Sequence, residues 1–455
     1  MKKLPVYTIL SSIALCATFA AAQDITPTRI GPVSQYGQLI TGKNSQGQGR
    51  IYGSCNGVKD GAEVQVRGMS LYWSMVPRAT EFWTPEGIAT MVNDMNIQIV
   101  RAAMGTTSDD WWGCKDGTES CGDDKSKHIT GYATDAEFQT NLMNTVVQAA
   151  IENDIYVIID WHSHQAHDEV SNATKFFTEM AQKWGKYDHV IFELFNEPTD
   201  ISWSTIKTYA EKIVPVIRQN SDNLILVGNR QYDQNPQEAI GNLVSGENIA
   251  YTFHYYANSH CWEGQTSWGS QCEGANAQQA INAGLSVFVS EWGTANADGG
   301  GDPDQGRNAS WQQWIDKNQL SWANWSASRV NEGTAAFSND ANRNSLQYTT
   351  SGNLVKGYLA TNPTSYNKCA TGGEEGDETA IGLKAETGYS VTFTEKALHI
   401  AGTTATVEIF NVNGTKLLTV DHVSGTLSLA ALPAGKYLAR IRGESSKLVR
   451  AFQIK

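Results

Sequence analysis

The sequence predicts a (β/α)8 barrel (a TIM barrel) followed by a small C-terminal β-sandwich, that is, an α/β fold with an all-β appendage. From residue 63 to residue 325, eight short apolar runs alternate with helix-like segments, and parallel strands joined by helical crossovers form one such barrel. No Gly-x-Gly-x-x-Gly follows the first run, which argues against the rival doubly wound sheet. Beyond residue 381, short alternating strands separated by turns replace this pattern.

Residues 1–22 have the three zones of a secretory signal peptide. Lysines at 2 and 3 precede an apolar core over 9–19, and alanines at 20–22 precede Gln23. The apolar run is too short to span a bilayer, and Leu15 stands where lipidation of Cys16 would need a small residue. We therefore expect cleavage after Ala22, no membrane span, and a secreted or cell-surface protein.

The segment 23–50 is rich in Gly, Gln, Ser and Thr, and we expect an N-terminal arm that leads to a hairpin near 51–55. The barrel domain is expected over 51–368. Its strands are expected at 63–69, 97–104, 156–162, 190–196, 224–228, 249–256, 287–291 and 320–325. Its helices are expected at 85–93, 135–152, 170–183, 203–220, 278–283, 310–317 and 354–360.

The tail begins with an acidic, glycine-rich stretch over 369–381 that contains almost no apolar residues, which is typical of a linker. The predicted β-sandwich domain over 382–455 has turns at 413–414 and 433–435. Its strands are expected at 389–393, 397–401, 405–411, 416–420, 426–429, 435–442 and 448–454.

Six cysteines follow the leader, and an even number in an exported chain favours disulfides. Two close pairs, Cys114–Cys121 and Cys261–Cys272, bracket polar loops, which leaves Cys55–Cys369 to join the ends of the barrel domain. This pairing rests on proximity, since six cysteines allow 15 connectivities. Zinc is the alternative, but no Cys-x-x-Cys occurs.

The net charge of −13 argues against a nucleic-acid partner, because phosphate binding needs a basic surface. A neutral polysaccharide would be indifferent to that charge. The 14 Trp and 17 Tyr offer the flat aromatic surface on which sugars bind. We expect a monomer that needs no metal and no cofactor.

Two glutamates stand at the ends of apolar strands, where the carboxyl ends of barrel strands form one face. Glu197 follows the run that begins at Val190, and Glu291 ends the run that begins at Val287. Hydrolysis of a glycosidic bond needs such a pair, because one carboxyl protonates the leaving oxygen while the other meets the positive charge developing on the sugar carbon.

Seven motifs in consecutive order together resemble glycoside hydrolase family 5, in its bacterial endoglucanase branch. The resemblance covers about residues 65–336. The motifs are VRGMS (66–70), VRAAM (100–104), VIIDWH (157–162), FELFNEP (192–198), TFHYY (252–256), VFVSEWGT (287–294) and SWANWS (321–326).

The resemblance implies a retaining mechanism, with Glu197 as general acid and then base, Glu291 as nucleophile, and their carboxyls about 5 Å apart. It implies that Arg101 and Tyr256 donate hydrogen bonds to Glu291. Further roles follow for four residues: Asn196 would bind the sugar 2-hydroxyl, His254 would influence the proton of Glu197, His162 would bind substrate, and Trp325 would stack on a sugar ring and precede a cis peptide bond.

Each role has an alternative. Glu193 lies on the same strand as Glu197 and competes for the role of acid, and we interpret it as a buried structural carboxylate. His162 and His164 have the spacing of two metal ligands, but no third ligand is apparent. Arg101 could instead form a structural ion pair within the barrel.

The sugar-binding contacts are where the chain departs from the family pattern. Val330 stands where this branch usually has a lysine, and Tyr232 follows the fifth strand in place of a common tryptophan. Further candidates for substrate binding are Tyr72, Trp73, His164, Trp112 and Trp262, the last two beside cysteines.

The predicted function is that of a secreted retaining endo-β-1,4-glucanase acting on a β-glucan polysaccharide. The same machinery acting on mannan, xyloglucan or mixed-linkage glucan is one alternative, and a non-catalytic carbohydrate-binding barrel is another. The stretch 407–416 and the final strands resemble C-terminal sorting domains of type IX secretion, which implies the secretion machinery as a partner. A carbohydrate-binding module is less favoured because no tryptophan follows residue 382, and a passive spacer remains open.

Overall fold

The computed structural model describes residues 24–454 except 56–61, 108–109, 119, 123, 263–271, 370–380, 385–389, 395, 412–415, 434 and 443–446. The chain divides into two compact units, Met1–Cys369 and Ala370–Lys455. The predicted signal peptide and all but the ends of the predicted linker lie outside the described residues. None of the helices in the described ranges combines the length and apolar character that a membrane crossing requires.

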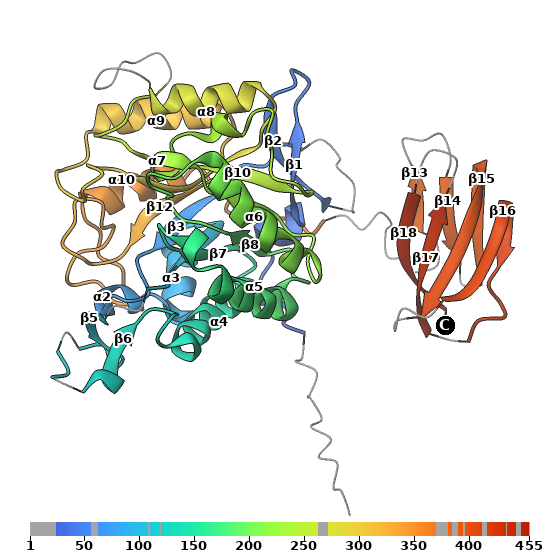
Figure 1. Cartoon of the computed structure of the whole chain (residues 1–455), viewed down its shortest axis with the longest axis horizontal. Helices are drawn as coiled ribbons and strands as arrows, with labels where there is room; N and C mark the ends of the chain where they lie inside the picture. Colours follow the sequence, from blue (N-terminus) through green and yellow to red (C-terminus); the bar gives the residue numbers. More distant parts are fainter. Residues whose placement is uncertain are drawn as a thin grey trace, which may run out of the picture. The chain divides into compact units, whose positions relative to one another are not determined.

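The first unit is a closed barrel of parallel strands, as predicted (Figure 1). Sequence order and order around the barrel coincide, and the last strand pairs with the first. The strands are β3 (Arg67–Leu71), β4 (Ile99–Gly105), β7 (Tyr156–His162), β8 (Val190–Glu193), β9 (Ile225–Val227), β10 (Ile249–Tyr256), β11 (Val287–Gly293) and β12 (Trp322–Ala327).

Helices surround this barrel and bury their apolar faces against the outward side chains of its strands (Figure 1). They are α3 (Pro85–Met95), α4 (Ala136–Glu152), α5 (Val170–Trp184), α6 (Trp203–Arg218), α8 (Glu273–Asn282), α9 (Gln305–Lys317) and α10 (Thr350–Leu359). Two short segments, α2 (Pro77–Thr80) and α7 (Arg230–Asp233), lie in connections between strands. Helices α9 and α10 begin earlier than predicted because their first turns are fixed by caps and not by apolar spacing. Asp304 accepts the Arg307 N–H at 2.9 Å, and Thr349 accepts the Gly352 N–H at 3.1 Å.

The barrel interior changes from apolar to polar along the strands. Its lower layer is apolar and includes Ile158, Ile191, Leu226, Ala250 and Phe288. Because strand side chains alternate between faces, the next inward positions lie one layer nearer the carboxyl ends. These positions are Arg101, Asp160, Glu193 and Thr252, all fully buried. The polar layer supports a site at the carboxyl face.

The N-terminal segment predicted as an arm contains α1 (Pro32–Tyr36) and β1 (Leu39–Lys43), which pairs with β2 (Gly49–Gly53). A second hairpin is formed by β5 (Asp110–Cys114) and β6 (His128–Thr130). The three predicted disulfides are present, with Cα–Cα distances of 5.5 Å for Cys55–Cys369, 5.8 Å for Cys114–Cys121 and 5.3 Å for Cys261–Cys272.

The second unit is an antiparallel β domain. Its strands are β13 (Ile381–Lys384), β14 (Ser390–Thr394), β15 (Ala397–Asn411), β16 (Lys416–Ser428), β17 (Gly435–Arg442) and β18 (Lys447–Ile454). Strand β15 is continuous where the sequence predicted two strands, because its ladder with β16 crosses the expected break through register shifts. One half of β15 pairs with β14 and the other with β17.

Candidate active site

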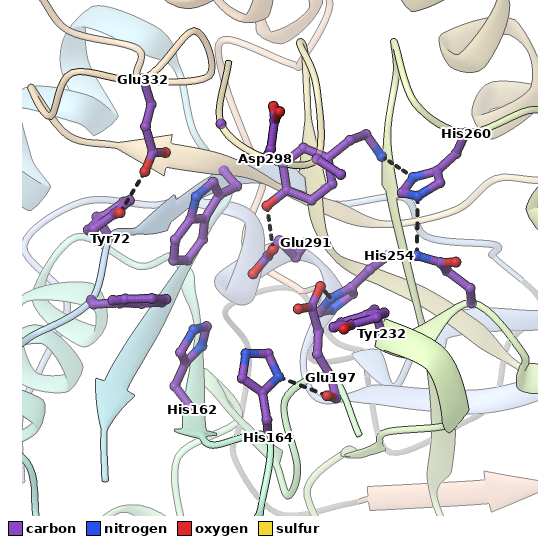
Figure 2. A pocket seen from close by; sticks show the side chains of 16 residues that line it. Tyr72, His162, His164, Glu197, Tyr232, His254, His260, Glu291, Asp298 and Glu332 are labelled. Atoms are coloured by element: carbon purple, nitrogen blue, oxygen red, sulfur yellow. Dashed lines mark hydrogen bonds and ion pairs between the residues drawn. The ribbon is translucent and has the colours of Figure 1, made fainter. Parts of the chain in front are cut away.

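A cavity of about 700 Å³ opens at the carboxyl ends of the barrel strands (Figure 2). Ten of the side chains predicted to act in the site line it: Tyr72, Trp73, His162, His164, Glu197, Tyr232, His254, Tyr256, Glu291 and Trp325. Two more, Arg101 and Asn196, are buried and in contact with one another beside these residues. Residues separated by more than 250 positions in the chain therefore meet in one site.

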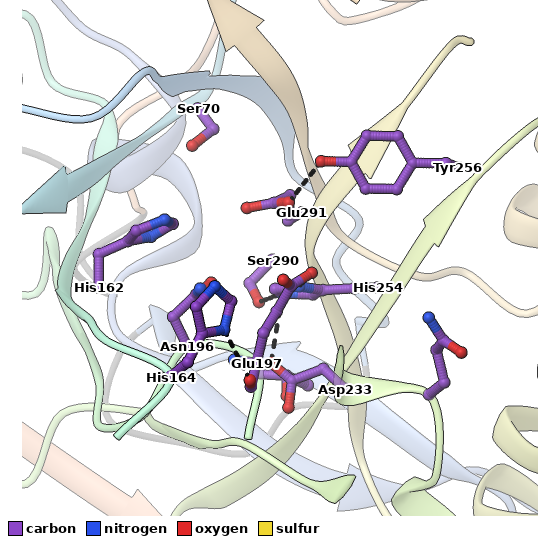
Figure 3. Close-up of polar contacts among 12 residues, drawn as sticks. Ser70, His162, His164, Asn196, Glu197, Asp233, His254, Tyr256, Ser290 and Glu291 are labelled. Atoms are coloured by element: carbon purple, nitrogen blue, oxygen red, sulfur yellow. Dashed lines mark hydrogen bonds and ion pairs between the residues drawn. The ribbon is translucent and has the colours of Figure 1, made fainter. Parts of the chain in front are cut away.

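Glu291 receives a strong hydrogen bond on each carboxylate oxygen. Arg101 Nη1 donates to Oε2 at 2.7 Å. Tyr256 Oη donates to Oε1 at 2.7 Å (Figure 3). A guanidinium at this distance favours the ionised carboxylate. The contact geometry therefore holds Glu291 as an anion, the form that a nucleophile needs.

Arg101 also holds the polar layer under the cavity. Its guanidinium bonds both oxygens of Glu193, at 2.8 and 3.2 Å, and lies 2.9 Å from Asp160 Oδ2. Burial alone lowers the pKa of Arg101, but these carboxylates and Glu291 outweigh it and raise that pKa well above its usual value. Glu193 does not line the cavity, whereas Glu197 does.

Asn196 is oriented by the same guanidinium. Its Oδ1 accepts from Arg101 Nη2 at 2.7 Å, and the residue is almost fully buried. Arg101 thus contacts both Asn196, the residue next to Glu197, and Glu291 itself. This arrangement combines the two alternatives considered for Arg101, since it is a buried ion pair that also positions site residues.

Glu197 has surroundings of a different kind. Its backbone is left-handed, with φ of 50°, and is fixed by two bonds: its N–H donates to Asp233 Oδ2 at 3.0 Å, and its carbonyl accepts from His164 Nδ1 at 2.8 Å. Its carboxyl meets His254 Nδ1 at 3.0 Å. Burial raises the pKa of Glu197 to about 7, against smaller lowering effects of His164 and Arg101. A carboxyl with this pKa holds a proton that it can donate near neutral pH.

The two histidines that flank this carboxyl pair are neutral. Burial lowers the pKa of His254 to about 4 and the pKa of His162 well below its usual value. His162 Nδ1 lies 2.7 Å from Asp160 Oδ2, and burial raises the pKa of that carboxyl to about 7 although Arg101 lowers it. Neutral rings of this kind bind hydroxyl groups and leave the Glu197 proton in place.

One carboxylate oxygen of Glu197 and one of Glu291 lie within 4.8 Å of each other, with a His254 nitrogen within the same distance of both. This separation is shorter than the roughly 6.5–9.5 Å at which two carboxyls leave room for a water beside a bound sugar, and it suits direct attack of one carboxylate on a sugar carbon.

Aromatic rings form one wall of the cavity. The Trp325 ring lies parallel to His162, with centroids 5.5 Å apart, and 4.9 Å from the Tyr72 ring. The expected cis peptide bond between Trp325 and Ser326 is present. Glu332 also lines this wall and accepts a hydrogen bond from Tyr72 at 2.7 Å (Figure 2). It stands two residues after Val330, where the sequence had already signalled a departure from the family.

Tyr232 and His164 line the cavity away from Tyr72 (Figure 2), and Gln234 also lines the cavity. Tyr232 is 49% exposed, and its ring meets His164 edge-on with centroids 6.2 Å apart. Gln234 bonds the ring of His260 at 3.2 Å, and both line the cavity. Gln234 and His260 were not predicted, and neither stands in a motif.

One predicted sugar contact, Trp262, is not brought to this cavity. Trp262 is absent from its lining and packs its ring against Trp311, with centroids 6.2 Å apart and the Arg307 guanidinium 6.0 Å above it. Trp262 is thus a packing residue of the barrel domain. The prediction for Trp112 falls on a side chain outside those that the structure describes.

Ser290 and Asp233 touch the site but were missed by the sequence analysis. In β11 the register against both neighbouring strands shifts by one residue between Phe288 and Trp292, so a bulge turns Ser290 and Glu291 inward together. Asp233 reaches the Glu197 N–H because the chain is left-handed over 231–233. A bulge depends on the partner strands, so the sequence of β11 alone carries no signal for it.

Comparison with known proteins agrees with the seven motifs. The family model for cellulases, glycosyl hydrolase family 5, matches residues 58–331, more than half of the chain. Endoglucanase Z of Dickeya dadantii is 38% identical over 307 residues, which cover 67% of this chain and 64% of that protein. Endoglucanase A of Evansella cellulosilytica is 35% identical over 292 residues, which cover 62% of this chain and 52% of that protein.

The chain thus spans just under two thirds and about half of the lengths of these two relatives. Among solved structures, the alkaline cellulase K catalytic domain superposes with a TM-score of 0.61 at 29% identity, over 74% of this chain and 97% of that domain. The match of the family model, together with the fold, shows that this chain belongs to glycosyl hydrolase family 5, the cellulase family.

Proposed function

We propose that the protein is a retaining endo-β-1,4-glucanase that cleaves internal bonds of a β-glucan by double displacement. The observation that carries the proposal is the contact distance of at most 4.8 Å between the Glu197 and Glu291 carboxyls, combined with their opposite surroundings. Retaining glycosidases hold their carboxyls about 5 Å apart, whereas inverting ones leave room for a water molecule.

In the first step the Glu291 carboxylate attacks the anomeric carbon, and its C–O bond forms as the glycosidic C–O bond breaks. Glu197 gives its proton to the departing oxygen, so the leaving sugar ends as an alcohol. In the second step Glu197, now ionised, takes a proton from water while the water oxygen displaces Glu291. Both glutamates return to their starting state.

Arg101 and Tyr256 keep Glu291 ionised until attack, and Glu197 keeps its proton because burial raises its pKa to about 7. The rings of Trp325 and Tyr72 offer apolar faces for pyranose rings. Endo action on a glucan is supported by the two relatives named endoglucanases.

The test measures reducing ends released from soluble β-1,4-glucan, viscosity, and the anomeric form of the first product by proton NMR. We expect wild type to lower the viscosity rapidly and to release an initial β-anomer. Glu291→Ala should neither lower the viscosity nor release reducing ends. An initial α-anomer would contradict retention, and equal, negligible release by wild type and variant would favour a non-catalytic binding barrel. Faster turnover of mannan, xyloglucan or mixed-linkage glucan than of β-1,4-glucan would change the proposed substrate but not the proposed mechanism.

The proposal includes secretion, supported by the leader pattern over 1–22 and by the sorting-domain motifs of the second unit. A truncation tests the role of that unit, and it must end after Cys369, because Cys369 pairs with Cys55. We expect the truncated enzyme to keep its activity on soluble glucan and its adsorption to cellulose while losing export in the native host. Loss of adsorption with intact export would instead indicate a carbohydrate-binding module.

A further inference from the structure

We propose that Ser290 fixes the proton on Glu197 by setting the tautomer of His254, which makes Ser290 a positioning residue for the acid. The inference rests on the proposed function and deepens it. It follows from an unbroken chain of hydrogen bonds through Glu193, Ser290, His254 and Glu197. Figure 3 shows Ser290, His254 and Glu197 of this chain.

The direction of each hydrogen bond is set from the buried end of this chain. Both oxygens of Glu193 face N–H groups of Arg101, at 2.8 and 3.2 Å, so Glu193 acts as an acceptor. Ser290 Oγ lies 2.9 Å from Glu193 Oε1 and must donate its one proton there. The serine is fully buried, so its hydroxyl is shielded from bulk solvent.

With its proton committed, Ser290 can only accept from His254, whose Nε2 lies 2.9 Å from Oγ. A neutral imidazole that carries its proton on Nε2 has a lone pair on Nδ1. Nδ1 lies 3.0 Å from Glu197 Oε1, so the hydrogen bond between them must be donated by the carboxyl. The resting enzyme therefore holds Glu197 as the protonated acid that the first step needs.

Removing the hydroxyl frees the ring to exchange tautomers. His254 would then carry its proton on Nδ1, donate to Glu197 and stabilise the carboxylate. The other charged or titratable groups around the pair are Arg101 on β4, Asp160 and His162 on β7, His164 after β7, Glu193 on β8, Asp233 on α7, Tyr256 on β10 and Glu291 on β11. The competing partners of Nε2 are Asp233 Oδ2 at 3.6 Å and Glu193 Oε1 at 3.8 Å, both beyond hydrogen-bond range.

The test compares the pH profile of kcat/KM for wild type and Ser290→Ala on soluble β-1,4-glucan, with Ser321→Ala as a matched control. Ser321 is equally buried, and its hydroxyl accepts the Val66 N–H at 3.0 Å and takes no part in the site. We expect the basic limb, near pH 7 in wild type, to move down by about one pH unit in Ser290→Ala, the size of one lost hydrogen bond. We expect no shift in the control.

A second measurement is independent of turnover and of any variant. In full-length wild type labelled with ¹⁵N-histidine, the His254 signals should show a protonated Nε2 and an unprotonated Nδ1. Protonated Nδ1 in wild type, or an unmoved basic limb in active Ser290→Ala, would overturn the proposal. Inactive wild type would instead refute the proposed function, so the two failures are distinguishable.

Discussion

The two glutamates of the cavity lie in neighbourhoods that differ in charge. Around Glu291 a guanidinium and a phenol donate to both carboxylate oxygens. Around Glu197 a neutral imidazole and backbone bonds take their place, and burial raises the pKa to about 7. The same side chain at two strand ends is thus given opposite protonation by its contacts. The barrel register brings Arg101 under Glu291. We infer that this placement gives Glu291 the role of nucleophile and Glu197 the role of acid.

The largest expected effect comes from replacing Glu291, the proposed nucleophile. Glu291→Gln keeps the shape of the side chain but cannot form a sugar ester, and it should lose about five orders of magnitude in kcat on every substrate. Steady-state rates on soluble glucan and on an activated aryl cellobioside measure this loss. A variant within tenfold of wild type on either substrate would remove Glu291 from the role of nucleophile.

The same substitution at Glu197, the proposed acid, should have a different effect. Glu197→Gln cannot give a proton to the leaving oxygen and should lose about 10³-fold on glucan. An aryl leaving group of low pKa needs no proton, so we expect a much smaller loss in the first step with a dinitrophenyl cellobioside, measured as the pre-steady-state burst. Equal losses of burst rate on both substrates would show that Glu197 is not the acid.

Arg101 is expected to matter for stability as well as for rate. Arg101→Met leaves the buried carboxylates Asp160, Glu193 and Glu291 without their cation, which should lower the free energy of unfolding by about 3–5 kcal/mol in urea titrations.

Arg343→Met is the matched control for this change. The Arg343 side chain is 41% exposed in its ion pair with Glu81, so its loss should cost less than about 1 kcal/mol. Similar losses in the two variants would contradict the central place given to Arg101.

Both kcat/KM and stability should depend on pH through the raised pKa of Glu197. Glu197 must be protonated to act, so kcat/KM should fall about tenfold per pH unit above pH 7. The pKa values of Glu197 and Asp160 are raised to about 7, so their protons are held by the folded state and released on unfolding. The stability that they contribute is therefore complete below the ordinary carboxyl pKa and is lost as pH rises through about 7. Unfolding titrations between pH 4 and pH 8 check this sign.

The smallest expected effect concerns two tryptophans. Trp325→Ala removes a cavity wall and should raise KM about tenfold. Trp262→Ala should leave KM unchanged, because its ring packs on Trp311 and not in the cavity. A clear rise of KM in Trp262→Ala would restore the predicted sugar contact.

The sequence could predict the barrel and most of the site wherever one strand alone determines which way a side chain points. The expected bounds of β7 and β10 agree with the structure because alternation runs unbroken to His162 and Tyr256. The sequence predicts side-chain direction less well where that direction depends on the neighbouring strands. Alternation along β11 cannot turn Ser290 and Glu291 inward together, since the bulge that does so is defined by β10 and β12.

Asp233 and Trp262 show the same limit in loops. The left-handed backbone over 231–233 brings Asp233 to the Glu197 N–H, although none of the three residues is glycine. Trp262 follows a cysteine in a polar segment that suggested a sugar platform, but its ring meets Trp311 in a T-shaped contact and the Arg307 guanidinium lies over it. Such contacts join distant segments, and the local pattern of residues does not encode them.

The most direct test of the central assignment is covalent capture of the intermediate. A 2-deoxy-2-fluoro cellobioside with a good leaving group should inactivate the full-length enzyme, and mass spectrometry of its peptides should locate one added cellobiosyl group on Glu291. The account predicts labelling there and none in Glu291→Gln. A sugar found on Glu197, or sustained turnover of this compound without any labelled peptide, would contradict the account.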